Sequence, residues 1–156
     1  MAAPANPVPR EQQVQEDLMR LEAYRNQLNA LLQQHQILVS SRGDHLRARE
    51  SLEGIDRAEP GTEMLLPLGG ETLVRGTVTK ELPVLIGVGS GIIVEMDRPK
   101  AVELLAERLG RIDQAIREIE GQVGSLEDRI QILSRRIDAL AASAPPGAGP
   151  SDVGGD

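Results

Sequence analysis

Residues 102–140 read VELLAERLGRIDQAIREIEGQVGSLEDRIQILSRRIDAL, and this stretch decides the fold. Its apolar residues recur at alternating steps of three and four, the repeat of a helix that packs against another helix along its length. At 1.5 Å per residue the helix spans roughly 60 Å, longer than a small globular core covers. The stretch therefore predicts one half of a coiled coil. The repeat consists of Val102, Leu105, Leu109, Ile112, Ile116, Ile119, Val123, Leu126, Ile130, Leu133, Ile137 and Leu140.

A second apolar stripe precedes this helix and lies between Arg10 and Leu52, a segment without proline. The stripe is wider and less regular, and a strict seven-residue frame would place His35, Arg25 or Arg42 in the contact seam. We therefore expect a long helix that packs on one partner and leaves side surface open in places. The stripe comprises Val14, Leu18, Leu21, Tyr24, Leu28, Leu31, Leu32, Leu38, Val39, Leu46 and Leu52.

The segment between the two predicted helices has the pattern of short strands. Glycine-containing turns at 69–70 and 89–91 separate paired apolar runs, which is typical of β-hairpins. Short strands of this kind are marginal alone, so either the coiled coil or other chains cover them. Their apolar residues on both faces favour burial against other subunits. The four strand-like runs are 64–68, 72–78, 84–88 and 92–95.

The predicted fold is α+β, a long antiparallel coiled coil with two β-hairpins between its helices. Two helical arms of nearly equal length fold back on each other most simply, which brings the N-terminal part of the first beside the C-terminal part of the second. The predicted order is a disordered arm (1–9), a helix (10–57), two hairpins for oligomerisation (62–96), a helix (97–144) and a disordered tail (145–156).

Composition excludes several classes of function. A net charge of -7 over 156 residues argues against a nucleic-acid partner. The chain has no cysteine, which excludes disulfides and thiolate metal sites and is compatible with a reducing compartment. Neither a long apolar run nor a signal-peptide pattern is present, so we expect a cytoplasmic protein without a membrane partner.

No catalytic, cofactor-binding or metal site is predicted. The run Gly87-Val88-Gly89-Ser90-Gly91 superficially resembles a phosphate-binding loop, but a strand rather than a helix follows it, which favours a tight turn. His35 and His45 are ten residues apart and lack cysteine companions, so they support no metal site. The carboxylates are spread along helix faces as solvated charge, and no nucleophile–base set is recognisable, so we do not expect an enzyme.

A group of apolar residues gathers where the predicted helix ends meet. One explanation is that these residues simply close the coiled coil. The other is that part of the group faces water and holds exposed hydrophobic segments of another protein, because two helices cannot hide a wide apolar stripe. Both explanations remain open from the pattern. The group comprises Val8, Val14, Leu18, Met19, Leu133, Ile137 and Leu140.

With this order of elements in place, the sequence resembles the alpha-type subunits of the prefoldin family. The resemblance extends from about residue 11 to residue 140 and is carried by Leu66-Pro67-Leu68-Gly69-Gly70, by Val84-Leu85-Ile86-Gly87-Val88-Gly89-Ser90-Gly91 and by Val94-Glu95 before the second helix. The number of hairpins matters, because the beta-type subunits of this family have one hairpin.

The resemblance implies an ATP-independent chaperone, a holdase, in which two such subunits assemble with four beta-type subunits. It implies that the apolar helix ends capture non-native client proteins and pass them to a group II chaperonin. A structural coiled-coil adaptor that binds one folded partner is the alternative. The resemblance also implies that the hairpins form an intersubunit β-barrel built by Leu65, Leu66, Leu68, Leu73, Val74, Val78, Val84, Leu85, Ile86, Val88, Ile92 and Val94.

Overall fold

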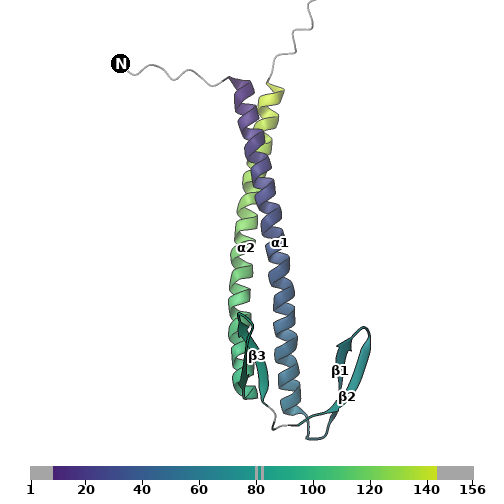
Figure 1. Ribbon diagram of the computed structural model, residues 1–156. Helices are drawn as coiled ribbons and strands as arrows, with labels where there is room; N and C mark the ends of the chain where they lie inside the picture. The colour runs from purple at the N-terminus through teal and green to yellow at the C-terminus, as the bar shows by residue number, and fades with distance from the viewer. Residues whose placement is uncertain (1–8, 80, 82, 144–156) are drawn as a thin grey trace, which may run out of the picture. The chain divides into compact units, whose positions relative to one another are not determined.

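The structure is a computed structural model that describes residues 9–79, 81 and 83–143. It confirms the predicted α+β class: two long antiparallel helices with two β-hairpins between them in sequence. Most of the predicted arm (1–8) and the predicted tail (145–156) lie outside the described residues. The elements are α1 (Arg10–Arg57), β1 (Glu63–Gly69), β2 (Thr72–Thr77), β3 (Val84–Gly89), β4 (Ile92–Met96) and α2 (Arg98–Ala142) (Figure 1).

The chain divides into two compact units, each of which contains a part of both helices. We call residues 35–118 the hairpin unit, and the described residues before and after them the terminal unit. In the terminal unit, Arg10 Nη1 donates a hydrogen bond of 3.0 Å to the Ser143 carbonyl oxygen, and Arg136 Nε lies 3.0 Å from Asp17 Oδ2. The residue that comes later in α1 contacts the residue that comes earlier in the C-terminal segment, so the two segments run antiparallel.

The hairpin unit repeats this antiparallel pattern. Arg42 Nε lies 2.5 Å from Asp113 Oδ1, and Arg98 Nε lies 3.4 Å from Asp56 Oδ1. Arg98 is buried at the start of α2, whereas Arg42 and Asp113 are partly exposed beside the helix contact. Charged side chains thus line the edges of the helix pair and cross it at several levels.

The apolar repeat of α2 is its buried face. Apart from Arg98 and Ala101 at its start, every buried residue in the described part of α2 belongs to the predicted repeat. The described part of α1 buries only Asp17 and Leu21, although its half-buried residues follow a seven-residue frame that includes His35. Helix α2 is therefore covered by a helix whose own contact face is partly polar. The buried residues of the α2 repeat are Leu105, Leu109, Ile119, Leu126 and Leu133.

Each hairpin is a two-stranded antiparallel sheet. Leu66 pairs with Val74 across β1 and β2, and Ile86 pairs with Val94 across β3 and β4. Both turns contain residues with positive φ. In the second turn Ser90 has a φ of 52°, and glycines on either side of it also have positive φ, which glycine adopts without steric cost. The glycine-rich run 87–91 is thus the end of a hairpin.

The second hairpin is anchored on the helices of the hairpin unit. Ile86 is buried against Ala101 and Leu105 of α2, and Ala101 is completely inaccessible to solvent. Arg108 Nη2 donates a hydrogen bond of 2.8 Å to the Gly87 carbonyl oxygen and ties β3 to α2. A small residue at 101 and a branched one at 86 thus fit together. Leu52, Val84, Met96 and Leu104 pack around this contact.

We predict that Ile86→Ala destabilises the isolated chain by about 2 kcal/mol or more, because it leaves a cavity where the hairpin meets α2. Ile93→Ala on the same hairpin is the matched control, since its side chain is 66% exposed. Urea unfolding monitored by circular dichroism measures both variants. Equal losses would show that Ile86 does not anchor the hairpin.

We also predict that Gly121→Ala stabilises the protein by about 0.5–1 kcal/mol, because alanine favours the helix and an added Cβ meets no atom within 4 Å. Gly89→Ala is the contrasting variant. Its backbone has a φ of +109°, which an L side chain rarely adopts, so the same change there lowers stability. Urea midpoints of the two variants are expected to move in opposite directions, and a fall for Gly121→Ala would show that the helix at this position does not gain from a side chain.

Candidate functional site

Two large apolar side chains of the terminal unit face solvent in one turn of α1. Leu18 is 48% exposed and Met19 is 64% exposed. On the side of this turn that contacts α2, Asp17 and Leu21 are buried. We call Leu18, Met19 and the grooves beside them the terminal surface.

Two grooves lie beside this turn and are lined by both apolar and charged side chains. Such a surface can hold an extended or helical apolar segment by burying apolar area, but the lining residues form no arrangement for catalysis. Gln15 belongs to both grooves. The first groove is lined by Gln15, Leu18, Met19, Leu21, Glu22 and Arg25, and the second by Arg10, Glu11, Gln12, Val14, Gln15, Leu140 and Ala141.

The structure separates the residues that the sequence had grouped at the helix ends. Leu133 is buried against the opposite helix, whereas Val14, Ile137 and Leu140 are half-buried. Val14 and Leu140 also line the second groove, so they contribute both to helix contact and to surface. Val8 lies outside the described residues. A role of this group in client binding stays a prediction.

Two residues of the terminal unit were missed by sequence reasoning. Ile132 on α2 is 67% exposed, one position before the buried Leu133. Asp17 is only 2% exposed. A signal for Asp17 was available, because it follows Val14 by three residues and precedes Leu21 by four, which places it in the seam of a strict frame.

Asp17 is paired across the helix contact with Arg136 of α2. Its Oδ2 atom lies 3.0 Å from Nε of Arg136, whose own side chain is 55% exposed. That oxygen is buried and has no partner with hydrogen-bond geometry among the described residues. The carboxylate therefore depends on a single charge that itself lies close to solvent.

The hairpins present the second apolar surface. On β1–β2, both faces are open: Leu65 and Leu73 are 59% and 56% exposed, and Leu66 and Val74 are also exposed. On β3–β4, Ile86 is buried but Leu85 is 68% exposed. Among the residues assigned to a barrel, Val78 and Ile86 are buried and Val84 is half-buried, while the exposed ones are Leu65, Leu66, Leu68, Leu73, Val74, Leu85, Val88, Ile92 and Val94.

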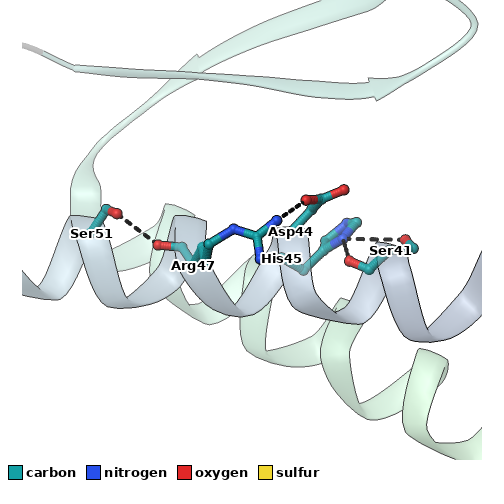
Figure 2. Close-up of polar contacts among 5 residues, drawn as sticks. All are labelled: Ser41, Asp44, His45, Arg47 and Ser51. Carbon is teal, nitrogen blue, oxygen red and sulfur yellow. Dashed lines mark hydrogen bonds and ion pairs between the residues drawn. The ribbon is translucent and has the colours of Figure 1, made fainter. Parts of the chain in front are cut away.

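The polar residues around His45 interact within α1 (Figure 2). His45 Nδ1 lies 2.8 Å from the carbonyl oxygen of Ser41, one turn earlier. Asp44 pairs with Arg47, and Ser51 Oγ donates a hydrogen bond of 2.7 Å to the Arg47 carbonyl oxygen. These contacts stabilise successive helical turns and leave no converging set of side chains. Within the described ranges, no group of three or more His, Asp or Glu side chains could hold a metal ion.

Neither helix, over the residues that the structure describes, contains an apolar stretch long enough to cross a membrane.

Comparisons with known proteins agree with this architecture. The family model described as "Prefoldin subunit" matches residues 24–143. The chain is 30% identical to prefoldin subunit alpha of Methanocorpusculum labreanum over 81% of this chain and 89% of that protein. It is also 30% identical to prefoldin subunit alpha of Pyrococcus horikoshii, over 73% of this chain and 78% of that protein.

Solved structures show the same fold. The prefoldin beta subunit from Thermococcus strain KS-1 matches with a TM-score of 0.55 at 23% identity, covering 86% of this chain and 95% of that one. A filamentous PFD from Methanocaldococcus jannaschii matches with a TM-score of 0.50 at 24% identity, covering 80% and 97%. The family match and the alpha relatives together establish the family of this chain. It belongs to the prefoldin family of non-enzymatic chaperones, as an alpha-type subunit.

Proposed function

We propose that this chain is a subunit of an ATP-independent holdase that captures non-native proteins at the ends of its helices. The observation that carries the proposal is the exposure of Leu18 and Met19 in one turn of α1, beside two grooves with apolar lining. Non-native proteins share exposed apolar segments rather than a fixed shape. Methionine suits such partners, because its flexible side chain adapts to irregular apolar surfaces.

One terminal surface binds weakly. Burying a leucine or methionine side chain gives about 1.5–3 kcal/mol before the entropy cost of association, and a millimolar dissociation constant already needs about 4 kcal/mol. Several such surfaces held in one assembly act on the same client at high effective concentration. The proposed function therefore requires an oligomer.

The hairpins are the proposed site of that assembly. Two copies of this chain would combine with four beta-type subunits, with strand edges and apolar hairpin faces joined in an intersubunit β-barrel. The exposed leucines on both faces of β1–β2 and the exposed Leu85 of β3–β4 support this proposal, because a two-stranded sheet in water leaves such area uncovered. The assembly would act in the cytoplasm and pass its clients to a group II chaperonin.

The double substitution Leu18→Ser and Met19→Ser tests the capture surface. We predict that it weakens suppression of client aggregation at least threefold, because it removes exposed apolar area without touching the buried seam. Light scattering of a thermally unfolding client measures the effect. Ile37→Ser, at an exposed apolar residue (69%) of the hairpin unit, is the matched control and is expected to change little.

Equal behaviour of the double variant and the control would contradict the assignment of the terminal surface. Binding of one folded protein, with no suppression for several unrelated unfolded clients, would favour the structural adaptor instead. Light scattering with three unrelated clients separates these outcomes.

The hairpin assignment has its own test. We predict that Leu85→Ser weakens the complex with a co-expressed beta-type subunit, because Leu85 is 68% exposed in the single chain and would be buried in a shared barrel. Native mass spectrometry reports the composition, and circular dichroism checks that the helices remain folded. Ile37→Ser again serves as control. An unchanged hetero-oligomer would exclude Leu85 from the interface.

A further inference from the structure

The terminal unit contains a buried acid in a position where an apolar residue would fit. Asp17 is 2% exposed and lies between Val14 and Leu21 in the seven-residue frame of α1. The opposite helix is apolar throughout its repeat at this end, where Leu133 is buried and Ile137 is half-buried. A carboxylate therefore sits in an otherwise apolar contact.

Burial of this carboxylate weakens the contact. Removing an ion from water is costly, and the attraction of one partner compensates only when the geometry is good and hydrogen bonds satisfy the remaining atoms. Asp17 Oδ2 has the Arg136 guanidinium at 3.0 Å, yet the alignment does not meet hydrogen-bond geometry and Arg136 is 55% exposed. An apolar residue at 17 would hold the helices together at least as firmly.

The same turn also carries the exposed apolar residues of the terminal surface. Leu18 and Met19 directly follow Asp17 and face solvent, while Leu21 is buried and also borders the first groove. Separation of the helices at this level would therefore join buried seam residues to the groove that already exists. A client bound there would gain apolar area that the closed helix pair does not offer.

We propose that the Asp17–Arg136 pair is a latch that keeps the ends of α1 and α2 closed but easily opened, so that a client gains access to Leu21, Leu133 and Ile137. This inference rests on the proposed holdase function and adds a control on its capture surface. In the closed form Asp17 is held by Arg136. In the open form water solvates the carboxylate, and client segments cover the seam.

Four substitutions in the full assembly test the latch. Asp17→Leu removes the buried charge, and Arg136→Leu leaves that charge without its partner. The double variant restores an apolar seam on both sides. Arg135→Leu, a neighbouring exposed arginine of α2, controls for the loss of one positive charge. Circular dichroism and native mass establish that each variant is folded and assembled.

Hydrogen exchange measures opening without any client. In Asp17→Leu, exchange at residues 10–24 and 129–142 is expected to slow about tenfold relative to the wild type, because a well-packed apolar seam opens less often. In Arg136→Leu it is expected to rise about tenfold, and the double variant is expected to resemble Asp17→Leu. Exchange in Asp17→Leu that is no slower than in Arg135→Leu would overturn the latch.

Client suppression then tests the consequence. Asp17→Leu is expected to suppress aggregation at least threefold less well than the wild type, although Leu18 and Met19 are intact. Slowed exchange with unchanged suppression would show that the seam is not used by clients and would overturn the inference, while the terminal surface remained in place. Absence of suppression by the wild type itself would instead contradict the holdase function, and the exchange data would still decide whether the pair controls opening.

Discussion

The structure depends on one constraint: α2 has an unbroken apolar seam that only another helix can cover. Its buried leucines and isoleucine recur over more than 28 residues between Leu105 and Leu133, too long for a compact core. Helix α1 provides the cover, but its seam includes His35 and Asp17, and its own burial is slight. The two helices are thus unequal partners. The side with the weaker seam carries the exposed apolar residues that the proposed capture function needs.

The two hairpins differ in how far the chain's own helices contact them. Ile86 packs on Ala101, and Arg108 holds the Gly87 carbonyl oxygen, so β3–β4 is joined to the helices. The strands β1 and β2 have exposed leucines on both faces, which a two-stranded sheet in water does not compensate. The single chain therefore leaves apolar residues of these strands uncovered. This is the physical reason that an oligomer is the natural setting for the proposed function.

Periodicity in the sequence was sufficient to predict both helices and both hairpins, because each element follows from a local pattern. It could not predict which partners the charged side chains would bind. Arg108 and Arg136 flank the α2 repeat in the same way as other arginines, yet one binds a strand carbonyl oxygen and the other a buried carboxylate. Such roles depend on which hairpin docks and on the register between the helices. Both are tertiary properties, which the pattern of one helix does not contain.

The turn from Asp17 to Leu21 inverts the usual rule for a helix pair. A sequence selected only for a stable coiled coil would bury the leucine and expose the carboxylate, whereas here Asp17 is buried and Leu18 and Met19 face water. Exchanging residues 17 and 18 would give a more ordinary seam with the same composition. The observed arrangement costs stability at residues 17 and 18. It makes physical sense where the surface must keep apolar side chains exposed and the helix contact must remain easy to open. The inversion therefore links the two proposals made for this end of the chain: exposed apolar residues make the first contact, and the charged seam sets how readily the rest of the apolar surface follows.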